Sequence, residues 1–366
     1  MRKQLLFGLF LAACCAPSAN AAHLFRLTEG NPQLKQAGTL AFGPQGVLFV
    51  GDNKSAAVFA IDTGDKEGDA AKTSVNVEDL GEKLALAVGV APGEVTINDM
   101  AVNPLSGNIY LSLSKGADET PALASINGHG DISEIALDNV WFSKAEIADA
   151  PEDREVGEGR RARNRRSETI TDLAFVEGNV IVSGMTNRES ASGVRSIAFP
   201  FGDQANGGSI EIYHAAHGRS EDNAAIRTFV PFVIDGKPNV LAGFTCTPLV
   251  RFPLDGLNEQ GKLKGTTVAE LGNRNQPLDM ITYEQAGKTY LLLSNSARGV
   301  MKISTDAIEQ NEGLTEPVRG GGTAGQSYQT IDELQGVVQL DRLNDAHAVV
   351  IVNKDNQLNL QTVPLP

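Results

Sequence analysis

The chain has 366 residues with a formal net charge of −14 at pH 7, and 38 of its residues are glycine. Nucleic acids and anionic membrane surfaces attract basic faces, so this charge argues against both as partners and favours cationic ones. The length is sufficient to bury a large core, either as one domain or as two.

The first 21 residues have the features of a secretory signal. Arg2 and Lys3 form a positive start, and residues 5–13 form an apolar run that is too short for a permanent bilayer span. The A-x-A sequence at residues 19–21 predicts cleavage before Ala22. We therefore expect a mature domain over residues 22–366.

The same stretch also fits a second processing route. Leu11-Ala12-Ala13-Cys14 reads as a bacterial lipobox, which would end the signal before Cys14 and place a lipid on that residue. Both routes predict a periplasmic protein, and the second adds an anchor at the outer membrane. No other apolar stretch approaches the roughly 20 residues of a transmembrane helix, so we expect no transmembrane segment.

Six later segments share one pattern of short apolar strands separated by turns with Gly or Asp. They cover residues 39–62, 97–126, 170–199, 226–254, 277–304 and 334–363. Repeats of three or four strands at this spacing are typical of a β-propeller, in which each sheet buries its faces on its neighbours. The sequence therefore predicts an all-β fold with a single propeller of six blades. Two alternatives stay open: a seventh blade within residues 127–168, or closure of the last blade by HLFRLTEG at residues 23–30.

The starts of three repeats read NDMA (98–101), TDLA (171–174) and LDMI (278–281), each leading into a first strand. With the G-x-V/I/Y hairpins that follow, the mature chain resembles the broad group of NHL, SMP-30-like and YVTN-type propellers. The resemblance implies that function lies on the face that carries the starts of the first strands and the loops between second and third strands.

Residues 143–168 interrupt the repeat with a charge-dense stretch that ends in EDREVGEGRRARNRRSE. Such a composition cannot pack into a core, and it predicts an exposed insertion. The insertion is either a solvated loop beside its acidic neighbours or a docking site for an acidic partner.

Cys246 is the only cysteine beyond Cys14 and Cys15, and it lies in TCTP at residues 245–248. This segment occupies the loop between the second and third strands of the fourth repeat. We therefore expect Cys246 on or near the functional face and outside the core.

The starts of the first strands predict a ring of polar groups at the channel mouth. Asp99, Asp172 and Asp279 occupy equivalent positions, with Arg227 or Thr228 in the fourth blade and Gln335 or Gly336 in the sixth. Each aspartate either caps backbone N–H groups of its own turn or, with Asn98, contributes an oxygen ligand to a Ca²⁺ site. The resemblance to SMP-30-like lactonases implies a Glu in such a cluster, and no Glu is evident at these starts.

Two further sets of side chains are candidates for binding. His214 and His217 precede the fourth repeat, and with Cys246 they predict a copper or zinc site. Arg227, Arg274 and Arg298 could bind an anionic ligand near the mouth. The alternative is that both histidines are ordinary loop or outer-strand residues.

No nucleophile or haem motif such as G-x-S-x-G, H-E-x-x-H or C-x-x-C-H is present. We therefore interpret the chain as a module that binds a small ligand or an envelope protein. The alternative is a metal-dependent enzyme, a lactonase-like hydrolase or an oxidoreductase, on the same face. A lipid-anchored scaffold is a third hypothesis.

Overall fold

The computed structural model describes residues 23–159, 162–202, 205–257 and 261–366. The expected signal, including Cys14, lies outside the described residues. The described chain is all-β apart from one α-helix, α2 (Leu80–Ala87), and short 3-10 turns. These turns are η1 (Pro44–Gly46), η2 (Ala70–Lys72), η4 (Arg165–Glu168), η5 (Leu254–Gly256), η6 (Ile308–Gln310) and η7 (Asp332–Leu334). None of the described helices is long and apolar enough to cross a membrane.

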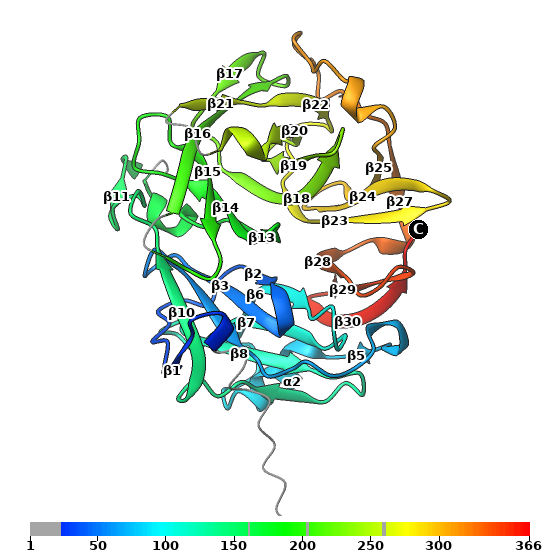
Figure 1. Cartoon of the computed structure of the whole chain (residues 1–366). Coiled ribbons are helices and arrows are strands. Elements are labelled where there is room, and N and C mark those ends of the chain that lie inside the picture. The colour runs from blue at the N-terminus through cyan, green and yellow to red at the C-terminus, as the bar shows by residue number, and fades with distance from the viewer. Residues whose placement is uncertain (1–22, 160–161, 203–204, 258–260) are drawn as a thin grey trace, which may run out of the picture.

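Six sheets radiate from a central channel and form a six-bladed propeller, which confirms the predicted fold class (Figure 1). The first blade, from the channel outward, is β2 (Leu40–Phe42), β3 (Val47–Asp52), β4 (Ala57–Asp62), β10 (Val140–Glu146) and β1 (Thr28–Gly30). The second is β6 (Val95–Val102), β7 (Ile109–Lys115), β8 (Thr120–Ile126) and β9 (Ile132–Glu134). The third is β13 (Asp172–Val176), β14 (Asn179–Met185), β15 (Ser192–Ala198), β16 (Ala205–His214) and β17 (Arg219–Glu221), with β21 (Lys262–Lys264) beside β16.

The other three blades follow the same plan. The fourth is β18 (Ile226–Ile234), β19 (Lys237–Phe244), β20 (Pro248–Pro253), β22 (Thr266–Glu270) and β26 (Ala324–Gly325). The fifth is β23 (Pro277–Gln285), β24 (Lys288–Asn295), β25 (Gly299–Ser304) and β27 (Tyr328–Ile331). The sixth is β28 (Val337–Arg342), β29 (His347–Lys354), β30 (Gln357–Pro364) and β5 (Asn76–Val77).

The order of blades around the channel differs from their order in the chain. The innermost strands β2, β6, β28, β23, β18 and β13 contact one another in a closed ring, so the second blade lies between the first and the sixth. In Figure 1 the cyan second blade accordingly adjoins the red sixth blade, and the blue first blade adjoins the green third. The chain reaches this order by adding β5 to the sixth blade, building the second blade, and returning to the first through β10.

This path overturns both alternatives left open by the sequence. HLFRLTEG does not close the last blade, because β1 pairs with β10 at the edge of the first blade and β5 closes the sixth. The described residues among 127–168 form no seventh blade, because they supply β9 to the second blade, β10 to the first, and a small hairpin of β11 (Glu155–Val156) and β12 (Arg163–Asn164).

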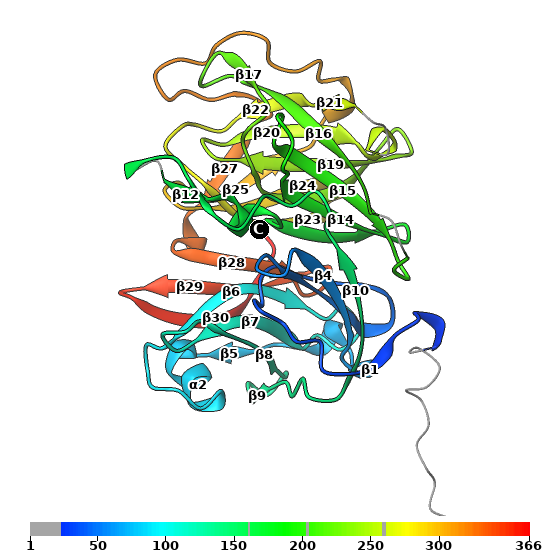
Figure 2. The same ribbon diagram turned by 90° about the vertical axis from the view of Figure 1, so that its left-hand side faces the viewer.

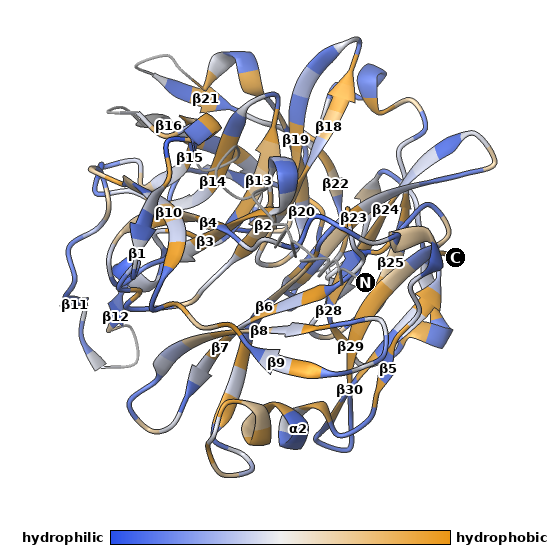
Figure 3. Cartoon of the chain, turned by 60° about the horizontal axis from the view of Figure 1, so that its bottom comes forward, coloured by the Kyte–Doolittle hydropathy of each residue, from blue (hydrophilic) through white to orange (hydrophobic). Residues whose placement is uncertain are grey.

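The hydrophobic core is divided into layers between adjacent blades. Val47 and Phe49 of the first blade pack against Val180 and Val182 of the third, for example, and every other pair of neighbours has its own buried apolar cluster. Figure 3 shows hydrophobic residues concentrated in the strands and hydrophilic residues in the connections. Each blade therefore depends on its neighbours for burial of both faces, as the repeat predicts.

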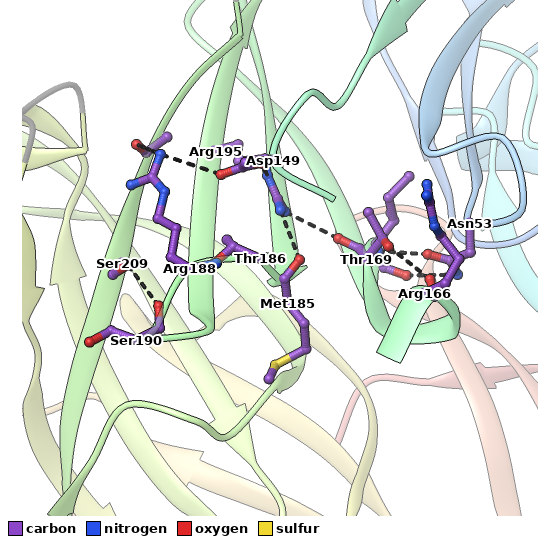
Figure 4. Close-up of polar contacts among 12 residues, drawn as sticks. Asn53, Asp149, Arg166, Thr169, Met185, Thr186, Arg188, Ser190, Arg195 and Ser209 are labelled. Carbon is purple, nitrogen blue, oxygen red and sulfur yellow. Dashed lines mark hydrogen bonds and ion pairs between the residues drawn. The ribbon is translucent and has the colours of Figure 1, made fainter. Parts of the chain in front are cut away.

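The segment between β10 and β13 is exposed at Glu152–Gly159 but is tied down at its start by a buried arginine. Arg195 on β15 is 2% exposed, and its Nε donates to Asp149 Oδ1 at 2.7 Å. Its Nη atoms donate to the carbonyl oxygens of Thr169 and Met185 (Figure 4). In the side view of Figure 2 the β11–β12 hairpin projects from the same face as the turn between β29 and β30.

Candidate functional site

The central channel holds a cavity of about 770 Å³ that is lined by residues of all six innermost strands. The cavity extends to the turns between first and second strands, where Pro104 and residues 343–347 line it. We call this side the hairpin face. The opposite side, which carries the turns between second and third strands, is the loop face. The volume falls within the range of sites that bind small molecules.

Four aspartates surround this cavity and form what we call the aspartate ring: Asp99, Asp172, Asp279 and Asp341. The structure thus brings together the three aspartates predicted from the sequence and adds a fourth. The ladder shifts register immediately before Asp99 and before Asp279. Such bulges re-aim a side chain, here toward the channel.

Each ring carboxylate joins two neighbouring blades. Asp99 Oδ1 accepts from its own neighbour Met100 N at 2.8 Å, and Asp99 Oδ2 accepts from Leu40 N of the first blade at 2.7 Å. The other three aspartates repeat this geometry. Oδ2 accepts from Phe229 N at 2.7 Å in Asp172, from Leu340 N at 2.9 Å in Asp279, and from Val102 N at 2.7 Å in Asp341. The inner edge of a sheet leaves N–H groups without strand partners, and the carboxylates satisfy them. The aspartates therefore cap backbone N–H groups as expected, and each of them also links its own blade to the next one.

The ring also concentrates negative charge around the channel, where its four carboxylates are half-buried. Burial raises the pKa of Asp99 to about 8, that of Asp172 to about 7 and that of Asp341 to about 6. Burial and then the charge of Asp99 raise the pKa of Asp279 well above its usual range. Backbone N–H donors oppose these shifts but do not cancel them. The ring therefore holds protons near neutral pH, and a bound cation would favour their release.

The predicted calcium ligands do not form a compact set. Within the described part of the chain, no three ring carboxylates bring oxygen atoms within 4.8 Å of one another. Asn98 donates its Nδ2 to Ala37 O at 2.7 Å and to Ser114 Oγ at 2.9 Å, so its side chain holds the loop before β2. A Ca²⁺ ion at the ring stays a prediction, and direct coordination by three of these carboxylates would require them to move closer together.

The loop face carries Cys246, which has a left-handed φ of 66° and is half-buried. Its N–H donates to Asn275 O at 2.8 Å. The predicted anion-binding arginines also lie away from the described lining of the cavity. Arg227 pairs with Glu168 at 3.0 Å, Arg298 donates to Asn273 O at 3.2 Å, and Arg274 is exposed.

The two predicted histidines meet each other and a carboxylate. His214 Nδ1 lies 2.8 Å from Glu221 Oε2, and His217 Nδ1 lies 2.8 Å from Glu221 Oε1. Among the described residues, these three form the group of His, Cys, Asp or Glu side chains whose possible metal-ligand atoms all lie within 4.8 Å of one another. The structure therefore does not place Cys246 with the histidines.

Sequence reasoning missed Asp341, Glu221 and Arg195. Gln339 directly follows the register shift in β28, as Asp99 directly follows the one in β6, so Gln339 occupies the position equivalent to Asp99. Asp341 lies two residues further along the strand, outside the position that the repeat defines. Glu221 lies in the same short segment as the histidines. Its proximity to them depends on the register of the β16–β17 hairpin, which pairs Glu221 with Ile212 and which the sequence does not reveal. Nothing in the sequence distinguishes Arg195 from an exposed arginine.

No protein-family model and no curated protein matches the chain. Among solved structures, the soluble aldose sugar dehydrogenase of Escherichia coli in its apo-form is 12% identical, with a TM-score of 0.32, over 93% of this chain and 100% of its own. An oxidoreductase of Thermus thermophilus, described as a glucose dehydrogenase, is 12% identical over 92% and 100%, with a TM-score of 0.34. A chain of a mitotic checkpoint complex is 10% identical over 99% of both chains, with a TM-score of 0.38. At these values no activity, ligand or partner is transferred to this chain.

Proposed function

We propose that the protein is a binding module whose central channel takes a small organic cation, such as a polyamine. The observation that supports this proposal is the convergence of four carboxylates on a cavity of about 770 Å³. The net charge of −14 favours the approach of cations in the same way.

The electrostatics of the aspartate ring favour a cation over a neutral ligand. Each ring carboxylate already accepts two backbone N–H groups, so it needs no further hydrogen bond for structure. Burial raises all four pKa values, and the charges of other ring members raise those of Asp99, Asp172 and Asp279 further. An ammonium group in the cavity replaces this repulsion by attraction. A chain with two or more amines matches the spread of the ring better than a bare ion does, because the oxygens are too far apart to share one.

Spermidine is therefore expected to bind the full chain with affinity that increases from pH 6 to pH 8, as the ring releases protons. Isothermal titration calorimetry in two buffers of different ionisation enthalpy would also show proton release on binding. Replacement Asp279→Asn is expected to weaken binding by about tenfold or more, equivalent to about 1.4 kcal/mol. Asp118→Asn, at an exposed turn between β7 and β8, is the matched control and should leave the affinity unchanged.

Three results would distinguish the hypotheses. Binding of spermidine that is equal in the two variants would place the cation elsewhere on the acidic surface and overturn the proposal. Stoichiometric Ca²⁺ binding that is lost in Asp279→Asn, without spermidine binding, would replace it by the calcium site predicted from the sequence. An absence of both, with the native fold retained, would overturn any cation site in the channel.

An enzyme on the same face is the second candidate, supported by carboxyl groups whose pKa values lie near neutrality. Asp172 (pKa about 7) and Asp341 (pKa about 6) line the cavity and could exchange protons with a bound substrate. Lactone hydrolysis followed with a pH indicator, with and without Ca²⁺, tests the lactonase that the resemblance to SMP-30-like propellers implies. Export, with or without a lipid on Cys14, stays part of the proposal, and an envelope protein remains the alternative partner.

A further inference from the structure

A group of metal-ligating side chains lies on the outer edge of the third blade, in the hairpin formed by β16 and β17. The register pairs His214 with Arg219 and Ile212 with Glu221. Positions 212 and 214 share one face of β16, and cross-strand partners share that face as well, so Glu221 lies beside His214. The turn closes with Gly218 N donating to His214 O at 2.8 Å, and it returns His217 over the same face.

The resulting contacts are close and specific. The two imidazole rings have centroids 3.8 Å apart with an interplanar angle of 38°. Both Nδ1 atoms lie 2.8 Å from oxygens of Glu221, and ligand atoms of all three residues lie within 4.8 Å of one another. His214 is 2% exposed, while the side chain of His217 is 42% exposed. The group therefore has a fixed inner side and a side that solvent reaches.

Two buried polar atoms around this turn have no hydrogen-bond partner among the described residues. One is Nε2 of His214 and the other is Oε1 of Glu270, a fully buried residue of the fourth blade. Glu270 reaches the same turn, because its Oε2 accepts from Ala216 N at 3.0 Å. A buried polar atom without a partner is costly, and a bound ion or water is one of the explanations for such an atom in a native structure.

We propose that His214, His217 and Glu221 form a binding site for a divalent transition-metal ion of the Zn²⁺ class. Two imidazoles and one carboxylate are a known ligand set for zinc, with the fourth position left to water or substrate. Imidazole nitrogens select zinc, copper or nickel over calcium and magnesium, which prefer oxygen ligands. The site lies on the outer edge of a blade and is independent of the channel.

The two distances from imidazole nitrogen to carboxylate oxygen need only a small adjustment to admit the ion. Ligand atoms about 2.0–2.1 Å from a tetrahedral metal are roughly 3.3 Å from one another. The present Nδ1-to-oxygen separations are 2.8 Å, so the ligands separate by about half an ångström as the metal enters. The exposed side chain of His217, at a turn, can make that movement while His214 stays fixed in the blade.

Arg219 and Glu270 are expected to tune the site in opposite directions. Arg219 donates its Nε to Glu221 Oε1 at 3.0 Å, so it competes with the metal for that oxygen and adds a repelling charge. Coordination through Nδ1 of His214 places the remaining proton on Nε2, and Glu270 supplies a buried carboxylate on the same turn. We assign Glu270 an electrostatic supporting role, because its carboxylate is held against this turn through Ala216 N and adds negative charge that favours a bound cation.

The test is Zn²⁺ binding to the full chain, measured by dialysis with elemental analysis and by competition with a chromophoric chelator. One ion per chain is expected in the native protein and none in His217→Ala, whose exposed position separates loss of the ion from loss of the fold. His129→Ala, at an exposed turn of the second blade, is the matched control and should retain one ion. Arg219→Gln is expected to bind several-fold more tightly, and Glu270→Gln about tenfold less tightly.

Cobalt substitution distinguishes this ligand set from one that includes the thiol. The Co²⁺ form is expected to show tetrahedral ligand-field bands without a thiolate charge-transfer band, and Cys246→Ser should give the same spectrum. A thiolate band, or loss of the ion in Cys246→Ser, would overturn Glu221 as the third ligand. Zn²⁺ retained in His217→Ala, or an absence of bound Zn²⁺ in the native chain, would overturn the site altogether.

Discussion

Arg195→Met is expected to lower the free energy of unfolding by about 2–4 kcal/mol, because it leaves two buried carbonyl oxygens without their side-chain donor. The arginine is 2% exposed and makes hydrogen bonds to Asp149 Oδ1, Thr169 O and Met185 O (Figure 4). Methionine keeps the aliphatic packing but leaves the two carbonyl oxygens without their side-chain donor, while Asp149 keeps its contact with Arg188. Urea denaturation at constant pH measures the loss.

Arg188→Met is the matched control, because Arg188 contacts the same carboxylate from solvent. Its Nη2 lies 3.4 Å from Asp149 Oδ2, and its side chain is 41% exposed. Exposed ion pairs contribute about 0–1 kcal/mol, so the control should change the free energy of unfolding by less than about 1 kcal/mol. Limited trypsin digestion adds a local readout. Arg195 contacts Asp149 and Thr169, the two ends of the segment that contains Arg163–Arg166, so Arg195→Met should speed cleavage at those arginines. Equal, small effects of both replacements would contradict the anchoring role.

The fold was largely accessible from the sequence because each blade repeats one local pattern. All six predicted segments correspond to blades, since alternating apolar residues and glycine-containing turns are local signals. The exchanged order of the first two blades was not accessible, because it depends on where β5 and β10 pair, and β5 has two residues while β10 lies outside the six repeated segments. Pairing partners distant in sequence leave no mark in a two-residue strand such as Asn76–Val77.

The candidate site residues also divide into those that the repeat predicts and those that depend on strand register. Asp99, Asp172 and Asp279 could be found because the repeat places them in one slot, and rotational arrangement of blades converts one slot into a ring. Asp341 reaches the ring from a different position, and its inclusion depends on the register of β28. Cys246 was grouped with the histidines only because they lie near one blade boundary, whereas the hairpin register brings Glu221 to them instead.

The aspartate ring has a second large consequence, which is stability that decreases as pH rises from about 6.5 to 8. In the unfolded chain these carboxyl groups ionise near pH 3.8, whereas in the folded protein the pKa is about 8 for Asp99 and about 7 for Asp172. Between those values the folded state binds more protons than the unfolded state, so raising the pH favours unfolding. Each proton so retained contributes a slope of about 1.4 kcal/mol per pH unit. We expect the free energy of unfolding at pH 6.5 to exceed that at pH 8 by about 2 kcal/mol or more.

The pH range over which stability decreases with rising pH has a lower limit, because other groups make the protein less stable as the pH falls. Burial lowers the pKa of His214, and three donors led by His214 outweigh burial and lower the pKa of Glu221. The stability that His214 contributes is therefore lost as the pH falls below about 6.5, and that of Glu221 only as it falls below about 4.5. Glu270, whose pKa is raised to about 7 by burial, acts with the ring. The comparison is made between pH 6.5 and pH 8, where the carboxyl groups with raised pKa values dominate.

Salt and substitution separate the ring from the general effect of a net charge of −14. At 0.5 M NaCl the repulsion between exposed charges is largely screened, whereas interactions between the half-buried carboxylates of the ring are screened less, so most of the slope should persist. Asp99→Asn removes one titrating group and should reduce the slope by up to about 1.4 kcal/mol per pH unit, while Asp118→Asn should leave it unchanged. A slope that disappears in salt, or that is the same in both variants, would place its origin on the surface and would remove the electrostatic basis for cation binding in the channel.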